Sequence, residues 1–209
     1  MILPLIVAAD LAGHWPDDMA GSPAMSSAVL AELNRARTAP ASLVAALREE
    51  SGSFHDRLLS RAGAEAAFMT QEGVAPVIEA IGFVDREPAT VELASSPVLA
   101  AAAADHRMEQ SATGLTGHGG SDGSTPADRV RRYGGERYVG EVITYGSRDP
   151  GDIVRQLIVD DGVADRGHRR LMFDPSLRYA GVSCGTHPAY RYVCVVTFGR
   201  TPDGRPLRD

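Results

Sequence analysis

Two histidines and several carboxylates carry the chemistry that this sequence offers. His118 lies in a glycine-rich loop, and His168 follows a glycine at the expected start of a short helix. Glu141 interrupts an otherwise apolar run, where a buried carboxylate costs free energy unless it is paired or functional. Asp160 and Asp161 end a helical pattern upstream of the second histidine. The candidate site consists of both histidines, the glutamate and one of these two aspartates.

This set of side chains fits two kinds of chemistry. Two neutral imidazoles with carboxylates suit Zn²⁺ or another borderline divalent ion, with one position left open for water. The same groups could instead perform general acid–base catalysis. The candidates are far apart in the sequence and form no local ligand motif, so spacing alone does not choose between these uses. A structural alternative also stays open, in which Glu141 pairs with an arginine and the histidines hydrogen-bond to loop backbone.

A second motif competes for a catalytic role. The run Gly-Gly-Ser-Asp-Gly fits G-x-S-x-G, and Ser121, Asp160 and His168 follow the chain order of an α/β-hydrolase triad. A nucleophile elbow needs a strand directly before its serine, whereas a helix and a loop are expected before this one. Residues 121–124 are therefore interpreted as a turn that caps the helix beginning near Pro126.

The candidate residues must be positioned by a mixture of helices and strands. Apolar periodicity, caps and turn residues predict an order of elements typical of an α+β layered structure. Helices are expected at 26–48 (two, broken at Pro40), 70–83, 97–111, 126–133, 150–160 and 167–173. Strands are expected at 90–93, 138–145, 179–184 and 190–198, and residues 49–63 are expected to be irregular. His106, inside the helix 97–111, is interpreted as a packed or surface residue.

Composition and charge exclude several classes of function. The chain has 209 residues, of which 44% are hydrophobic and 23% charged, as in ordinary soluble domains. Its formal net charge of −6 argues against an electrostatic surface for nucleic acid. Residues 1–9 are apolar and end in small residues, as a weak export signal does, but they are too short to span a bilayer. No other segment approaches that length, so we expect no membrane span.

The two cysteines, Cys184 and Cys194, fall in the two expected C-terminal strands. If these strands form a hairpin, the cysteines could face each other across it. A disulfide would then indicate an oxidising compartment. Two buried free thiols are the alternative that spacing leaves open.

Around the candidate residues, the chain resembles the CAP superfamily. This is the group of cysteine-rich secretory proteins, antigen 5 and pathogenesis-related proteins, also called SCP-like. The resemblance is closest to bacterial and protist members, covers about residues 25–200 and rests on five motifs in a fixed order. The motifs are residues 115–124 with His118, Asp128-Arg129, Gly140-Glu141, Gly167-His168-Arg169, and the run from Pro175 to Gly181-Val182.

The resemblance implies a three-layer α-β-α sandwich with a central antiparallel sheet. It also implies a shallow cleft lined by two histidines and two acidic residues. When the site residues of the family are matched one by one to this sequence, His118 and His168 correspond to the histidines that can hold zinc or another divalent metal. Glu141 corresponds to the first acidic residue. Asp160 matches the second acidic position, where many members have glutamate, and Asp161 is the alternative. The chain departs from the family directly after Glu141, where Val142 replaces the usual asparagine.

The resemblance further implies an exported protein, extracellular or periplasmic, with an unknown protein or lipid ligand as its partner. Our first functional hypothesis is a binding or interaction module with a metal-capable cleft. The second is a metal-assisted peptidase or esterase, in which Glu141 or Asp160 activates water. A third and weaker hypothesis is the binding of lipid or sterol. The predicted organisation is a signal or linker extension (1–24), the CAP domain (25–200, with a helical part 25–88 and a core 89–200) and a polar tail (201–209).

Overall fold

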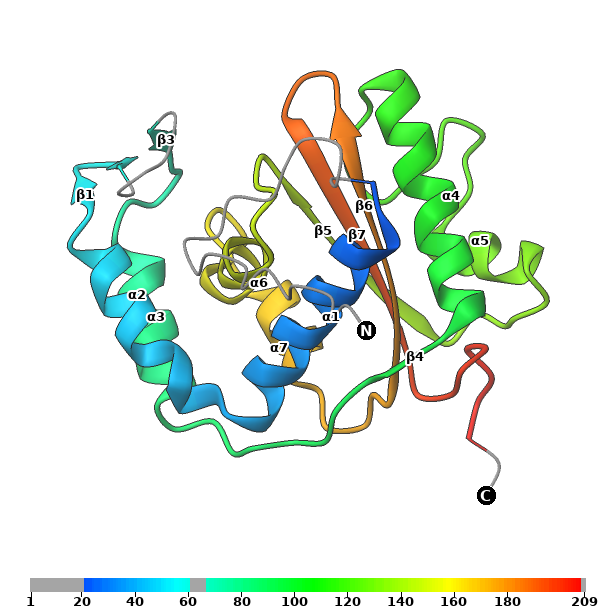
Figure 1. Cartoon of the computed structure of the whole chain (residues 1–209), viewed down its shortest axis with the longest axis horizontal. Coiled ribbons are helices and arrows are strands. Elements are labelled where there is room, and N and C mark those ends of the chain that lie inside the picture. Colours follow the sequence, from blue (N-terminus) through cyan, green and yellow to red (C-terminus); the bar gives the residue numbers. More distant parts are fainter. Residues whose placement is uncertain (1–20, 61–66, 208–209) are drawn as a thin grey trace, which may run out of the picture.

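A computed structural model describes residues 21–60 and 67–207, and it places a four-stranded sheet at the centre of the molecule (Figure 1). The strand order is β4-β6-β7-β5. The long strand β7 is antiparallel to both of its neighbours, β5 and β6, and the short β4 is parallel to β6. The strands are β4 (Ala94–Ser95), β5 (Val139–Tyr145), β6 (Tyr179–His187) and β7 (Arg191–Gly199). The predicted signal segment 1–9 lies outside the described residues, as do most of the linker and the last two residues of the tail.

Helices cover both faces of this sheet, which confirms the predicted α-β-α sandwich (Figure 1). One face is covered by α4 (Pro97–Thr113) and α5 (Pro126–Arg132). The other is covered by α1 (Pro23–Thr38), α6 (Pro150–Val159) and α7 (Gly167–Phe173). The largest apolar core cluster lies between the sheet and this second layer.

A helical pair and a small sheet form an additional layer outside α6 (Figure 1). The pair consists of α2 (Val44–Ser51), which follows the 3-10 helix η2 (Pro40–Leu43), and α3 (Ala75–Val84). The small antiparallel sheet contains β1 (Phe54–His55), β2 (Leu58–Leu59) and β3 (Phe68–Met69). The predicted break at Pro40 is confirmed, whereas the expectation that 49–63 is irregular misses the end of α2 and the hairpin β1–β2.

Two other expected boundaries are wrong because long-range hydrogen bonds decide them. The strand expected at 90–93 is absent among the described residues: the Arg37 side chain, on α1, donates to the carbonyl of Val91 (3.0 Å) instead. The helix expected from residue 70 begins at Ala75, because Gln71 N donates to the side chain of Asp161 (2.7 Å) and holds the preceding turn. Neither partner is near in the sequence, so local pattern could not show these contacts.

Helix α4 lies against the sheet at a position where only glycine fits. A Cβ atom at Gly181 of β6 would lie 2.0 Å from the backbone nitrogen of Ala100 and 2.1 Å from the carbonyl carbon of Leu99. The N-cap Ser96 fixes the start of the helix by accepting a hydrogen bond from Leu99 N (3.2 Å). This close contact sets the distance between the helix and the strands that carry the site.

The hairpin β6–β7 is cross-linked by a disulfide between Cys184 and Cys194, which face each other in the strand register. The structure therefore confirms the disulfide and excludes the alternative of two free thiols. The bond lies in the apolar core, where both residues are buried.

Ion pairs join the additional layer to the sandwich. Arg166, just before α7, donates to Glu72 (2.7 and 2.9 Å) and to Glu79 of α3 (3.0 Å). Arg169 donates to the same Glu79 (2.7 Å). The hydrogen bond from Arg166 lowers the pKa of Glu72 to about 2. The carboxylate form of Glu72 is therefore stabilised by folding.

Gly181→Ala should destabilise the protein by roughly 3 kcal/mol, because the added methyl group meets backbone rather than a movable side chain. The free energy of unfolding from urea titration measures this. Gly119→Ala is the matched control, since a Cβ there would meet nothing within 4 Å, and it should change stability little. Equal stability of the two variants would contradict the close contact of α4 with β6.

The stabilisation by Glu72 should depend on pH. Its pKa is lower in the folded protein than the ordinary value of 4.5, so its contribution is complete above that pH and is lost as pH falls towards about 2. Glu72→Gln should therefore be less stable than the wild type at pH 7, and the difference should disappear near pH 2. Urea titrations at several pH values measure this, with the exposed Glu92→Gln as control. A difference that stays constant with pH would rule out this linkage.

Candidate functional site

The first half of the site joins a loop histidine to a carboxylate in the sheet. Glu141 is in β5, and its side chain is almost completely buried. One oxygen accepts a hydrogen bond from Nδ1 of His118 (2.9 Å). Because an ionised carboxylate can only accept, Nδ1 donates in this contact, and Nε2 is the ring nitrogen that the carboxylate does not engage. About half of the His118 side chain is exposed (49%), so this nitrogen belongs to an accessible group.

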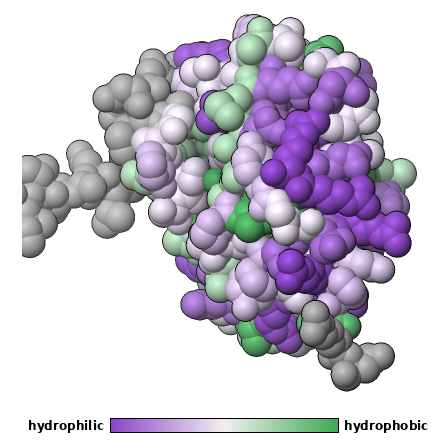
Figure 2. Space-filling model, turned by 90° about the vertical axis from the view of Figure 1, so that its right-hand side faces the viewer, coloured by the Kyte–Doolittle hydropathy of each residue, from purple (hydrophilic) through white to green (hydrophobic). Residues whose placement is uncertain are grey.

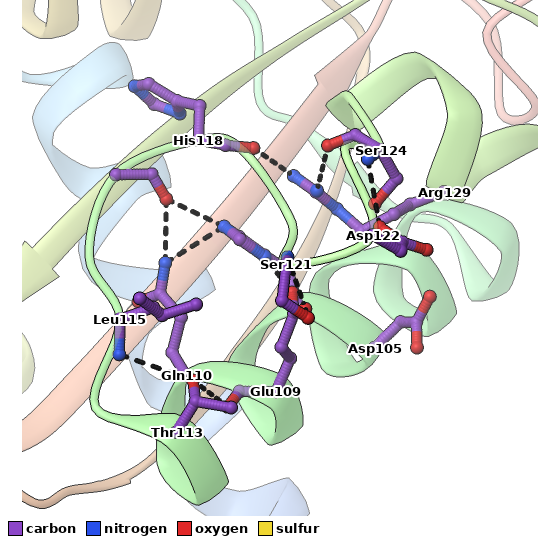
Figure 3. A network of polar contacts seen from close by, with 12 residues as sticks. Asp105, Glu109, Gln110, Thr113, Leu115, His118, Ser121, Asp122, Ser124 and Arg129 are labelled. Carbon is purple, nitrogen blue, oxygen red and sulfur yellow. Dashed lines mark hydrogen bonds and ion pairs between the residues drawn. The ribbon is translucent and has the colours of Figure 1, made fainter.

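A buried arginine neutralises Glu141 and holds the histidine loop. The guanidinium of Arg129, on α5, contacts both oxygens of Glu141 (3.1 and 3.0 Å). It also donates to the backbone carbonyls of His118 (3.0 Å) and Ser124 (3.2 Å). Figure 3 shows the carbonyl of His118 directed at Arg129 while the imidazole points away. Arg129 therefore fixes both the carboxylate and the backbone from which the histidine projects.

A second network positions the same loop from the side of α4 (Figure 3). The carbonyl of Gly117 accepts from Nε2 of the buried His106 (2.8 Å) and from the amide of Gln110 (2.7 Å). The amide N–H of Gly117 donates to the hydroxyl of Tyr145 (2.9 Å), which donates to Gln110 (3.0 Å). Burial raises the pKa of this tyrosine, so the hydroxyl stays protonated at neutral pH. His106 is thus a packed residue, as predicted.

The second half of the site pairs His168 with Asp160. Asp160 is the C-cap of α6 in the left-handed conformation (φ 58°), which places its side chain towards the start of α7. One oxygen accepts from Nδ1 of His168 (2.6 Å). The other accepts from the backbone N–H groups of His168 (2.9 Å) and Arg169 (3.3 Å). Asp160 thus accepts hydrogen bonds from free N–H groups at the start of α7 and at the same time orients the imidazole of His168.

Asp161 has a different role from its neighbour. Its carboxylate accepts from the backbone N–H groups of Gln71 (2.7 Å) and Glu72 (2.9 Å), in the turn before α3. The structure therefore places Asp160, and not Asp161, against His168. The sequence left this choice open because the two aspartates are adjacent and chemically equal.

The two halves meet at the outer edge of β5. The rings of His118 and His168 face each other with centroids 6.3 Å apart and planes inclined by 49°. The first comes from the side of α4 and α5, and the second from the side of α6 and α7 (Figure 1). All four predicted site residues are thus brought together from segments far apart in the sequence. The arrangement is two accessible imidazoles, each supported by a buried carboxylate.

The carboxylates support the histidines and do not point freely into the cleft. Both oxygens of Glu141 and both oxygens of Asp160 already accept hydrogen bonds. Within the described residues, no group of three or more His, Cys, Asp or Glu side chains is arranged to hold a metal ion. The protein donors that this geometry offers to a metal are therefore the Nε2 atoms of His118 and His168.

Four sequence-based interpretations are resolved by the same geometry. The structural alternative for Glu141 is half right, because the carboxylate pairs with Arg129 and also binds the His118 ring. Val142 points to the opposite face of β5 and packs in the core, so it does not border the cleft. Ser121 donates to Glu109 (2.6 Å) rather than to a histidine, which leaves no hydrolase triad. The helix that follows is capped by Thr125 and not by residues 121–124.

Sequence reasoning missed the residues that hold the loop. Gln110 and Tyr145 belong to no motif, and Arg129 is only part of the Asp128-Arg129 motif. An arginine in a short amphipathic helix is normally expected to be exposed to solvent. Nothing in the neighbouring sequence therefore indicates that Arg129 is buried. The available hint was Glu141, because a carboxylate in an apolar strand requires a partner.

The match to a family model identifies the class of protein. The model of the CAP, or cysteine-rich secretory protein, family matches residues 88–198, more than half of the chain. The chain therefore belongs to this family. The matched segment contains the sheet, both histidines and both supporting carboxylates. Residues 21–87, with α1–α3 and the small sheet, precede it. A comparison with curated proteins gives no match.

Two solved structures are similar to this chain at low identity. An outer surface protein from Borrelia burgdorferi is 15% identical over 52% of this chain and 77% of that one, with a TM-score of 0.43. An extracellular protein containing an SCP domain from Bacillus anthracis is 20% identical over 60% of this chain and 37% of that one, with a TM-score of 0.41.

Arg129→Met should destabilise the protein by about 3–5 kcal/mol, because it leaves the carboxylate of Glu141 buried without its partner. Urea titration of purified variants measures this. Arg131→Met, which removes an exposed arginine from the same helix, is the control and should cost less than about 1 kcal/mol. Adding Glu141→Leu to Arg129→Met should recover part of the loss. A double variant no more stable than Arg129→Met would argue against an unpaired charge as the cause.

Proposed function

We propose that the protein binds a divalent metal, with Zn²⁺ as the best candidate, and acts as an extracellular or periplasmic binding module. The observation that carries this proposal is the pair of facing imidazoles, each with Nδ1 bound to a buried carboxylate. A carboxylate on the remote ring nitrogen is the arrangement that metal-binding histidines commonly have. It fixes the tautomer, orients the ring and raises the basicity of Nε2.

The donor set also predicts how the metal would be held. His118 and His168 would supply two nitrogen ligands, and Zn²⁺ prefers four. The remaining positions would go to water or to a donor atom of a bound partner. Such a site is weaker than a structural zinc site with four protein ligands, but it is open to a second molecule. This openness supports a role in binding.

The metal-assisted hydrolase is less well supported by the contacts. A hydrolase of that kind needs a carboxylate that can take a proton from metal-bound water. Glu141 is held by Arg129 and His118, and Asp160 is held by the start of α7. Both carboxylates would have to give up existing hydrogen bonds to act as a base. The binding module therefore remains the primary proposal.

Export is part of the same proposal. The disulfide Cys184–Cys194 favours an oxidising compartment, since such bonds are rare where thiols are kept reduced. The family is named for secretory members. Among the residues that the structure describes, no helix has the length and apolar character needed to cross a bilayer.

Calorimetric titration with Zn²⁺ tests the metal site. The wild type should bind about one equivalent, and His118→Ala/His168→Ala should bind none, because each histidine supplies a ligand. His55→Ala, which removes an exposed histidine of β1, is the matched control and should bind as the wild type does. Affinity should fall on acidification, because protons compete for the ligating nitrogens. Zinc binding that persists in the double variant would show that the metal is held elsewhere.

A further inference from the structure

The two histidines of the proposed metal site are held by different parts of the chain. His118 is positioned by contacts inside the segment 88–198 that the family model matches. Its side of the molecule ends with α4 and α5, and Figure 2 shows polar side chains over the centre and right of that surface. His168 follows a loop, residues 160–166, whose polar contacts reach residues 71–79 of the additional layer.

Both ends of the loop 160–166 have a strained backbone. Asp160 (φ 58°) and Arg166 (φ 51°) are in the left-handed region, which residues other than glycine rarely adopt. Such residues persist only where their surroundings fix them. Helix α7, which carries His168 in its first turn, has only seven residues, and its N-cap residue makes no side-chain cap. A helix this short takes its position from its contacts rather than from its own stability.

Packing does not fix the loop on the side of the small sheet. A pocket of about 300 Å³ lies there, and its walls include Asp161 and Val163 of the loop together with His168. Thr70 and Gly73, in the turn before α3, also line it. Side chains that border a cavity lack packing partners on that side. On this side the loop is therefore held by polar contacts rather than by packing.

Two carboxylates fasten the loop to the turn before α3 in a reciprocal way. Asp161, in the loop, accepts from the backbone N–H groups of Gln71 (2.7 Å) and Glu72 (2.9 Å). The carboxylate of Glu72 accepts in return from the backbone N–H of Gly162 (2.7 Å) and from the guanidinium of Arg166 (2.7 and 2.9 Å). We call the contacts of these two carboxylates the clasp. It joins two segments that lie about 90 residues apart in the sequence.

Arg166 links the clasp to the histidine. Its guanidinium also donates to the backbone carbonyls of Asp160 (2.9 Å) and Val163 (3.1 Å), within the loop. Asp160 in turn accepts from the backbone N–H (2.9 Å) and from Nδ1 (2.6 Å) of His168. Direct hydrogen bonds thus connect Glu72 with the ring through the residues at the two ends of the loop.

We propose that Glu72 is a positioning residue of the metal site. This inference rests on the proposed function, in which His118 and His168 share one metal ion. Because the protein supplies only two ligands there, affinity depends on placing both Nε2 atoms to within about 0.5 Å. Glu72 contacts neither histidine, but it fixes the loop that places His168. Loss of the clasp should therefore weaken metal binding while both ligands remain.

Hydrogen exchange of backbone amides, followed by NMR in the presence of EDTA, tests the positioning step without any metal. In Glu72→Ala the amide of His168, which donates to Asp160, should exchange at least tenfold faster than in the wild type. The amide of Gly117, which donates to Tyr145 in the other half of the site, should keep its rate. A general loss of stability would accelerate both amides, so the contrast between them separates positioning from stability.

Calorimetric titration with Zn²⁺ tests the consequence for the site, in high salt that screens the loss of a charge. Glu72→Ala should bind zinc at least tenfold more weakly than the wild type, and so should Asp161→Ala, which opens the clasp from the loop side. Glu72→Gln keeps an oxygen for the N–H of Gly162 and should lose less affinity. Glu49→Ala, which removes an exposed carboxylate from α2 of the same layer, is the matched control and should bind as the wild type does.

Two results would overturn the proposal. The first is an unchanged exchange rate of the His168 amide in Glu72→Ala. The second is a zinc affinity of Glu72→Ala equal to that of a wild type that binds the metal. If the wild type binds no zinc, the proposed function fails, and the exchange rates alone decide whether Glu72 positions His168.

Discussion

The buried ion pair between Glu141 and Arg129 is the interaction on which the site depends. A pair of this kind contributes little net stability, because desolvation of both charges offsets their attraction. The main effect of this ion pair is to position the groups of the site. It keeps an ionised carboxylate beneath His118 and, through the same guanidinium, fixes the backbone of the histidine loop. One contact between α5 and β5 thus determines the tautomer of the ring and the place from which it projects.

The second half of the site reaches the same result by different means. Asp160 needs no arginine, because the backbone N–H groups at the start of α7 take up its charge. Its left-handed backbone conformation ends α6 and turns the carboxylate towards the next helix. The chain therefore builds two similar histidine–carboxylate pairs from unrelated local structures. They meet only because β5 is the outer strand, with one helical layer on each side of it.

That outer position also explains why a pocket adjoins the site. The additional layer α2–α3, with its small sheet, closes over the edge of β5 and supplies the apolar wall. Ion pairs from Arg166 and Arg169 to α3 hold this layer in place. Residues outside the segment matched by the family model thus shape the surroundings of residues inside it.

By itself, the sequence determined the elements whose signals are local: the helices from Pro97 and Pro150, the long strands, and the glycine-rich loop with His118. It also identified both histidines, through their residue types and through resemblance. Only the tertiary structure decided that Asp160 rather than Asp161 contacts His168, that Arg129 is buried, and that β4 lies at 94–95. The reason is physical. Periodicity and caps act over a few residues, whereas each of these outcomes depends on a partner that folding brings from far away in the chain.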